Sequence, residues 1–468
     1  MFKIFSSSRW TMRRVACAAG SFAAIAAVAA ISACGGGGGN NSAAAALALQ
    51  QAAAANQQPA STTTPPPQPP VTQQSIKHVF VLTMENKNFA DTFGTSTQDP
   101  FLKDLATKGA LLNQYFGTGH VSLDNYIAMM SGQPSTKETE SDCFQGFNDA
   151  TPDGWDFDNP KVLKTKDGKG CVYPTQVKTL PNQLDTIGVT WKGYMGDLGN
   201  DPTREAVTCG HPKIGAIDNT QSAQAPTADV PKGDQYATRH NPFVYFHSII
   251  DDQSYCDKHV VNLDANLEND LKSIDTTPNF VFVTPNLCDD GHDGDGTGTA
   301  GKGCVNGAKG GLASIDDFLK KWVPIIQASP AYQKDGLIVI NFDESADVVP
   351  AGSTTDPSTG VTTITANLPG ASCCGQKTGP NVTRPDDQYI PVSATVRYNL
   401  HYVGVGGDRT GAVMLSKWIK PGTVSDVQYN HYSLLKSLED IFQTKEYLGY
   451  ADDKALVTFG SDIFTNLQ

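Results

Sequence analysis

The chain has 468 residues, and its 48 aspartates and glutamates outnumber its 35 lysines and arginines, so the formal net charge is −13 at pH 7. This acidic balance, with no lysine- and arginine-rich run after Arg14, argues against nucleic acid as a partner. The chain beyond residue 75 is long enough to bury a large core, as one α/β domain or as two smaller ones.

Residues 1–33 have the pattern of a signal peptide. Arg13 and Arg14 precede an apolar, alanine-rich stretch. Cys34 follows it directly, which resembles the lipobox of bacterial lipoproteins; an ordinary secretory signal is the alternative. Residues 34–75 are of low complexity, so we expect a lipid-bearing cysteine and a tether. The sequence therefore predicts an exported protein that is anchored in the cell envelope, or is periplasmic or secreted, with membrane contact only through the anchor.

One α/β domain is predicted for residues 76–468, because strand and helix patterns alternate along it. Strands are predicted at Val79–Met84, Leu111–Phe116, Val189–Trp191, Phe280–Thr284, Leu337–Phe342, His401–Val405 and Ala412–Leu415. Helices are predicted at Phe101–Lys108, Leu123–Ser131, Pro181–Ile187, Leu263–Ile274, Ala313–Ala328 and Tyr432–Phe442. This alternation indicates a mostly parallel central sheet flanked by helices on both faces. Two polar segments, 132–178 and 195–238, are expected to shape the mouth of a pocket.

Eight cysteines follow Cys34, and an even number in an exported chain suggests disulfides. Local spacing favours the pairs Cys143–Cys171 and Cys209–Cys256, while the other four cysteines stay unassigned. A thiolate metal site is the alternative, but the sequence lacks CxxC pairs.

Acidic and amide side chains follow two of the predicted strands. Glu85 and Asn86 come directly after the first strand, and Asp343 and Glu344 come after the strand that ends at Phe342. The carboxyl ends of parallel strands lie at one edge of a sheet, where ligands bind. Crowded carboxylates repel each other unless a cation or protons compensate, and oxygen ligands suit Zn²⁺, Mg²⁺, Mn²⁺ or Ca²⁺. The pattern predicts a divalent metal site, with helix capping by Glu85 or Asp343 as the alternative.

A hydroxyl, Ser122, precedes the helix predicted at Leu123–Ser131. Free backbone N–H groups and the helix dipole favour an anion at such a position, so it suits a nucleophile that holds a phosphate. On its own, a serine here is more often a simple N-cap. Asn125 adds weight to the functional interpretation, because its amide can donate to a phosphate oxygen.

The segment Ser122–Tyr126 (SLDNY), followed by Ser131-Gly132, resembles the nucleophile motif of the phosphoesterase family that includes bacterial acid phosphatases and phospholipase C enzymes, within the alkaline-phosphatase-like superfamily. Asp124 departs from this motif, which usually has proline there. Five further blocks are similar to the family's blocks, in the same order: HVFVLTMENKNFADTFG at 78–94, RHNPF at 239–243, TPNLCDDGHD at 284–293, INFDES at 340–345, and NHYSLL at 430–435 with Glu439-Asp440.

The resemblance implies that Ser122 is the nucleophile and that four residues hold the metal beside it: Glu85, Asn86, Asp343 and Glu344. His292 is a candidate to bind the metal or to protonate the leaving alkoxide, and His240 is a candidate to contact the substrate or to protonate the leaving group. The substrate-binding candidates are Asn125, Arg239, Asp290 and His431. For the acidic turn around His292, a Ca²⁺ loop of Asp289, Asp293 and Asp295 is the alternative, although it lacks EF-hand spacing.

The reaction implied is metal-dependent hydrolysis of a small phosphate ester through a covalent phosphoseryl intermediate, as in an acid phosphatase. A phospholipase C acting on phosphodiester lipids is the first alternative, with a phospholipid as the partner. A non-catalytic binding lipoprotein is an alternative of another class. The substrate alcohol, the metal and the oligomeric state stay open at this point.

Overall fold

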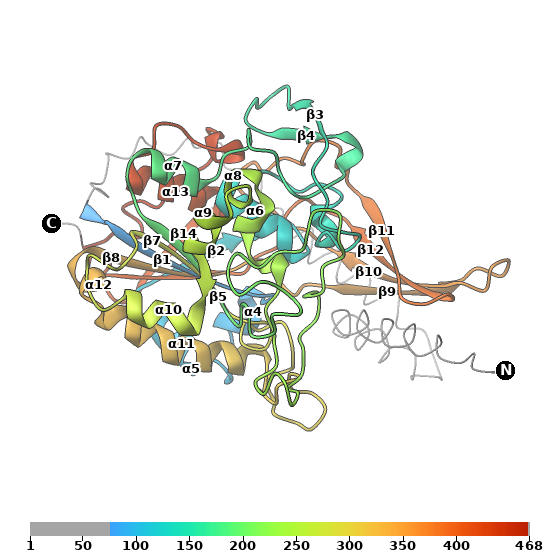
Figure 1. Ribbon diagram of the computed structural model, residues 1–468, viewed down its shortest axis with the longest axis horizontal. Coiled ribbons are helices and arrows are strands. Elements are labelled where there is room, and N and C mark those ends of the chain that lie inside the picture. The colour runs from blue at the N-terminus through green and yellow to red at the C-terminus, as the bar shows by residue number, and fades with distance from the viewer. Residues whose placement is uncertain (1–74, 467–468) are drawn as a thin grey trace, which may run out of the picture.

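The computed structural model describes residues 75–466, and eight strands form its central sheet (Figure 1). In spatial order they are β14 (Thr423–Asn430), β2 (Ala110–Phe116), β13 (Ala412–Ser416), β8 (Gly336–Phe342), β1 (His78–Met84), β7 (Phe280–Thr284), β5 (Trp191–Met195) and β6 (Val260–Asn262). Neighbours pair in parallel, except that β13 is antiparallel to both β2 and β8. The predicted mostly parallel sheet is therefore confirmed. The predicted signal peptide, the Cys34 anchor and the tether up to residue 74 lie outside the described residues.

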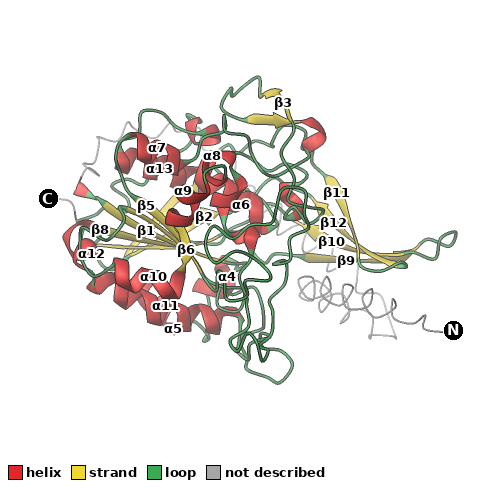
Figure 2. Cartoon of the chain, in the orientation of Figure 1, coloured by secondary structure: helices red, strands yellow, loops and turns green. Residues whose placement is uncertain are grey.

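Helices cover both faces of this sheet, as predicted (Figure 2). One face carries α6 (Ser122–Ser131), α7 (Leu180–Thr186), α8 (His247–Ile250), α9 (Gln253–His259) and α13 (His431–Phe442). The other face carries α5 (Pro100–Lys108), α10 (Leu263–Asp270), α11 (Gly311–Ala328) and α12 (Pro330–Asp335). A short helix α4 (Phe89–Phe93) follows β1, and η2 (Thr139–Ser141), η3 (Lys166–Gly168), η4 (Thr238–His240), η5 (Pro242–Tyr245) and η6 (Gly449–Asp452) are 3-10 turns. No helix within residues 75–466 is long and apolar enough to cross a membrane.

Strand β1 shows why the central strands are apolar along their whole length. Successive side chains point to opposite faces, so Val79 and Val81 join the core under α6 and α13, while Phe80 and Leu82 join the core under α5 and α11. All four side chains are completely buried. A strand covered on both faces gives a continuous hydrophobic run, which is the pattern that identified it in the sequence.

A second, four-stranded sheet leaves the main body between β8 and β13. Its order is β11 (Asp386–Pro391), β12 (Val396–Tyr402), β10 (Thr362–Leu368) and β9 (Val349–Thr355). In the main sheet Asn341 pairs with Ala412, so the chain departs and returns at adjacent points. Figure 1 shows the resulting arm in orange, extending away from the helices. A two-stranded sheet, β3 (Pro152–Trp155) with β4 (Leu163–Thr165), completes the strands of the described residues.

Three predicted elements differ most from the observed ones. The strand predicted at Val189–Trp191 begins at Trp191, because the backbone N–H of Val189 donates to Leu184 O and closes the end of α7. The helix predicted to reach Ile274 ends at Asp270, whose carbonyl accepts bonds from the hydroxyls of Thr276 and Thr277. The strand predicted at His401–Val405 is β12, which ends at Tyr402 and belongs to the arm, not to the main sheet.

The two predicted disulfides, Cys143–Cys171 and Cys209–Cys256, are confirmed. The four remaining cysteines form Cys288–Cys304 and the vicinal pair Cys373–Cys374. Cys143–Cys171 links two parts of the polar segment 132–178, and Cys209–Cys256 links the segment 195–238 to α9. Cross-links of this kind restrict the unfolded chain, and they hold irregular segments in place around the site.

Candidate active site

Three strands end at the same place, and their following residues meet there. Glu85 and Asn86 follow β1, Asp343 follows β8, and Asp290 lies shortly after β7. The backbone N–H of Asn86 donates to Asp343 Oδ1 at 3.0 Å, and the Asn86 amide donates to Glu85 Oε2 at 2.8 Å. Glu85 N donates to Asp290 O at 2.9 Å. The expectation that Glu85, Asn86 and Asp343 gather at one edge of the sheet is confirmed, and Asp290 joins them there.

Ser122 is the first residue of α6 and faces this edge. Its hydroxyl donates to Glu85 Oε2 at 2.9 Å, and the hydroxyl of Tyr126, one helical turn later, donates to Glu85 Oε1 at 2.6 Å. The next backbone N–H, that of Leu123, donates to Asp142 Oδ1 at 2.9 Å. The start of α6 is therefore fixed by two acidic residues from different parts of the chain.

Val121, directly before Ser122, has an unusual backbone conformation. Its φ of 76° is one that a β-branched residue rarely adopts, and such strain costs about 1–3 kcal/mol. Two contacts hold it there: Val121 N donates to Glu344 Oε1 at 2.9 Å, and the Asn125 amide donates to Val121 O at 3.2 Å. Strain of this kind concentrates at functional sites, which supports the sequence-based choice of Ser122.

Asn125 orders the loop in front of α6. Its Oδ1 accepts bonds from the backbone N–H groups of Thr118 at 2.8 Å and Gly119 at 3.0 Å, and its Nδ2 donates to Gly119 O at 3.0 Å. The side chain is completely buried and lies outside the lining of the cavity described below. The predicted contact between Asn125 and substrate stays a prediction.

His120 connects two buried carboxylates, a feature that the sequence did not reveal. Its Nδ1 lies against Glu344 Oε2, and its Nε2 lies 2.7 Å from Asp408 Oδ2. Burial opposes a charge on this ring, but hydrogen bonds to Asp408 and Glu344 outweigh burial and raise the pKa of His120 to about 10. A protonated His120 thus fixes Glu344, whose other oxygen holds Val121. The signal available in the sequence was only that His120 lies two residues before Ser122.

The side chains of Glu85, His240 and Asp290 lie close enough together to hold a metal ion. The ring of His240 stacks on Tyr126 at 5.3 Å, and its two nitrogens lie 3.3 Å from Glu85 Oε1 and 3.4 Å from Asp290 Oδ2. Neither nitrogen has a hydrogen-bond partner among the described residues. Burial lowers the pKa of His240 to about 3, so the ring is neutral and one nitrogen has a lone pair that can bind a metal ion. The sequence interpretation had placed His240 in proton transfer and Asp290 in substrate binding.

The cations Lys87 and Arg239 offset the charge of the acidic groups around Glu85 only in part. Burial, reinforced by Glu85 and Glu344, raises the pKa of Asp343 well above its usual range. Burial likewise raises the pKa of Asp290 to about 7. One oxygen of each, Asp343 Oδ2 and Asp290 Oδ2, is buried without a hydrogen-bond partner in residues 75–466. Buried oxygens without partners, beside a neutral imidazole, fit a divalent cation bound through oxygen and nitrogen.

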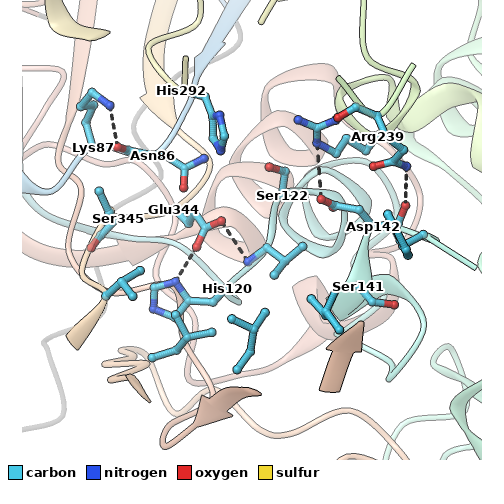
Figure 3. Close-up of a pocket in the computed structure, with 18 of the residues that line it drawn as sticks. Asn86, Lys87, His120, Ser122, Ser141, Asp142, Arg239, His292, Glu344 and Ser345 are labelled. Carbon is cyan, nitrogen blue, oxygen red and sulfur yellow. Dashed lines mark hydrogen bonds and ion pairs between the residues drawn. The ribbon is translucent and has the colours of Figure 1, made fainter. Parts of the chain in front are cut away.

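A cavity of about 380 Å³ opens in front of Ser122 (Figure 3). Both polar segments reach its lining, through residues that include Asp142 and Gln221. Arg239 also lines it, with Nε 3.4 Å from Asp142 Oδ2 and Nη1 3.1 Å from Gln221 O. Burial opposes the charge of Arg239, but Asp142 and Glu85 outweigh it and raise its pKa, so the guanidinium stays charged beside the serine. Such a cation can clamp a phosphate.

His292 also lines the cavity (Figure 3). Its Nδ1 lies 2.9 Å from Asp293 Oδ1, and its backbone N–H donates to Asp290 Oδ1 at 2.8 Å. Burial alone would lower the pKa of His292, but the hydrogen bond to Asp293 and the charges of Asp293 and Asp290 raise it. Its position and its proton suit a donor to a leaving group.

His431 is placed differently from the other candidates. It is completely buried at the start of α13, with Nδ1 3.0 Å from the Tyr115 hydroxyl and Nε2 2.5 Å from Asp343 O. Burial lowers its pKa to about 4. It lies behind the cavity lining and supports the backbone of Asp343, so its predicted substrate contact stays a prediction.

Fold and site together define an α/β protein whose site lies at the carboxyl ends of parallel strands, around a serine at a helix start. The chain belongs to the phosphoesterase family, whose sequence model matches residues 95–445. It is similar to the phosphate-repressible acid phosphatase of Penicillium chrysogenum, with 26% identity over 54% of this chain and 45% of the relative. It is also similar to an acid phosphatase of Aspergillus fumigatus, with 25% identity over 57% and 44%.

The chain spans about half the length of these curated relatives. Among solved structures, a protein in the alkaline phosphatase superfamily from Vibrio parahaemolyticus aligns with 80% of this chain and 67% of that one. That alignment has a TM-score of 0.37 and 13% sequence identity.

Proposed function

We propose that the protein hydrolyses phosphate monoesters, with Ser122 as the nucleophile of a covalent phosphoseryl intermediate. The observation that carries this proposal is the placement of the Ser122 hydroxyl. It sits at the start of α6, donates at 2.9 Å to the buried carboxylate of Glu85, and faces a cavity that Arg239 also lines. The family membership and the acid phosphatase relatives support the same reaction class.

In the first step, Ser122 Oγ forms a bond to phosphorus while the bond from phosphorus to the ester oxygen breaks. Arg239 binds the non-bridging oxygens, and His292 gives its proton to the departing alkoxide. Glu85, which accepts the hydrogen bond of the attacking hydroxyl, takes its proton. In the second step, water attacks phosphorus and gives a proton to His292, the bond to Ser122 breaks as Glu85 returns the proton to Ser122 Oγ, and phosphate leaves.

Three residues would hold a divalent cation at this site: Glu85, His240 and Asp290. Asp343, whose Oδ2 is buried without a partner among residues 75–466, lies next to this group. Asn86 and Glu344, which the sequence also predicted as ligands, lie beside them and line the cavity. The bound cation would lower the pKa of the serine hydroxyl and offset charge on the phosphoryl group. Zn²⁺, Mg²⁺, Mn²⁺ and Ca²⁺ are the candidates to be tested.

The test compares hydrolysis of p-nitrophenyl phosphate with that of p-nitrophenylphosphorylcholine, with and without EDTA. Ser122→Ala is measured beside Ser141→Ala, a matched serine in the same lining whose hydroxyl donates to Glu138 O at 2.9 Å. We expect the monoester to be preferred, EDTA and Ser122→Ala to abolish turnover, and Ser141→Ala to retain it. Acid quenching during turnover should trap phosphate on the peptide that contains Ser122.

Preference for the choline diester would instead establish a phospholipase C. No turnover of either ester with any of the four ions would overturn the enzymatic proposal and favour a binding lipoprotein. We further propose that the protein is exported, which the disulfides support because they form in oxidising compartments, and that Cys34 carries a lipid. Cys34→Ala should then abolish incorporation of labelled fatty acid.

A further inference from the structure

One side of the cavity is apolar, and it comes from the arm. Leu368 of β10, Ile390 of β11 and Leu400 of β12 line it together with Val348, which precedes β9. We call these four residues the apolar wall. They belong to, or pack against, one hydrophobic cluster of the arm. The wall is therefore part of the packed structure of the arm and is preformed.

The apolar wall adjoins the position where phosphorus must lie. Val121, the residue directly before Ser122, packs against the same hydrophobic cluster and also lines the cavity. An ester whose phosphorus lies at Ser122 Oγ has its charged oxygens on the side of Arg239. The whole cavity has a volume of about 380 Å³, which is much more than a phosphate group fills. The alcohol part of the ester must occupy the rest.

The chemistry of the wall limits which alcohol fits. Its four side chains carry no hydrogen-bond donor or acceptor, and the backbone of β12 is paired with β10 on one side and with β11 on the other. A sugar or polyol pressed against this surface would give up hydrogen bonds to water without replacement, which is unfavourable. An alkyl or aryl group would instead remove apolar surface from water.

We propose that the apolar wall binds the alcohol part of the substrate, so that the enzyme prefers phosphate monoesters of apolar alkyl or aryl alcohols over those of sugars and polyols. This inference rests on the proposed phosphomonoesterase activity and adds the substrate class. It assigns to the arm a direct part in selecting substrate, with Val348 and Ile390 as specificity-determining residues.

The test uses ethyl, butyl and hexyl phosphate, whose leaving alcohols are chemically alike, so a trend in kcat/KM reports burial of the chain. If each added methylene is half buried, kcat/KM should rise about twofold per methylene, or on the order of tenfold from ethyl to hexyl phosphate. Propyl phosphate and glycerol 1-phosphate form a second comparison, with the same number of carbons and two added hydroxyls. We expect propyl phosphate to be the better substrate.

Val348→Thr places a hydroxyl in the wall at nearly unchanged volume, and the hexyl-to-ethyl ratio should fall severalfold. Val349→Thr is the matched control, because Val349 is the next residue but is 42% exposed and lies outside the lining. Each ratio is taken within one preparation, so partial misfolding of a variant cancels. The control should keep the wild-type ratio.

A flat chain-length profile, or a ratio that Val348→Thr leaves unchanged, overturns this inference while the phosphomonoesterase proposal stands. Preference for glycerol 1-phosphate over propyl phosphate also overturns it. Failure to hydrolyse any of these esters, with each of the four ions added, overturns the proposed function and the inference with it.

Discussion

The hydroxyl of Ser122 donates to Glu85 Oε2 at 2.9 Å, which joins the first residue of α6 to the residue that follows β1. The same carboxylate accepts two further hydrogen bonds and still lies within 3.3 Å of the neutral ring of His240. A carboxylate so placed serves two purposes, because it orients the serine and adds negative charge to a buried acidic group.

Cation binding should be measurable without substrate. Chelator-treated protein should gain a higher Tm when the divalent ion that it binds is added. A free ion concentration of about 100 times Kd adds about 2.7 kcal/mol to the free energy of unfolding. Asp290→Asn should remove most of this shift in differential scanning fluorimetry. Asp295→Asn is the control, because Asp295 is in the same acidic turn but bonds to Thr297. Equal loss in both variants would instead support a Ca²⁺ loop.

Asp142→Asn should strengthen binding of phosphate esters above pH 6. Burial raises the pKa of Asp142 to about 6, with Arg239 acting against this. Above that pH the carboxylate repels the incoming phosphate, and asparagine retains the acceptor for Leu123 N. KM at pH 8 should therefore fall severalfold, a Coulomb effect of about 1 kcal/mol, and at pH 5 it should barely change. The exposed Asp153→Asn should change neither; a rise in KM at pH 8 would show that Asp142 mainly positions Arg239.

His120→Leu should cost about 3–5 kcal/mol of unfolding free energy at pH 7, because it leaves Glu344 and Asp408 buried without the cation between them. Urea unfolding monitored by tryptophan fluorescence gives the value. Adding Asp408→Asn to this variant should recover part of the loss, since one of the two charges is then removed. A cost below about 1 kcal/mol for His120→Leu would argue against a charged His120.

Glu439→Gln should make the protein less sensitive to alkaline pH. Burial raises the pKa of Glu439 from 4.5 to about 9, so between these values the folded state holds a proton that the unfolded state loses. Stability from this group is therefore complete below pH 4.5 and is lost as pH rises to about 9, at up to about 1.4 kcal/mol per unit. The stability of Glu439→Gln relative to wild type should increase from pH 5 to pH 8. The exposed Glu446→Gln should show no such trend.

The sequence predicted the main sheet well because its central strands are buried on both faces and are hydrophobic throughout. It also brought Glu85 and Asp343 together correctly, since β1 and β8 are adjacent parallel strands whose ends must meet. Most of the arm escaped prediction for other reasons. Strand β9 is exposed along its whole length and has no hydrophobic pattern, and the sequence interpretation did not recognise the alternation of Ile364, Ala366 and Leu368 in the mostly half-buried β10.

The parts of the site that the sequence missed depend on contacts between distant residues. His120 and Asp408 are 288 positions apart, and nothing local to either indicates that they touch. Asp142 comes from an irregular segment whose path is set by a disulfide. The role of His240 depends on burial and on stacking against Tyr126, which determine whether the ring is charged. The motif located the histidine but could not give its protonation state.

The chain leaves the main sheet at Phe342 and re-enters it at Ala412, and the two strands at these points are hydrogen-bonded neighbours. The segment between them can therefore change in length and sequence without moving any other strand. Its ends carry Glu344 and Asp408, which hold His120 between them, whereas Val348 and the strands β10, β11 and β12 carry the apolar wall. Grafting a different segment between these two ends offers a route to new substrate preferences on an unchanged reaction centre, and the same modularity would let natural selection diversify this chain.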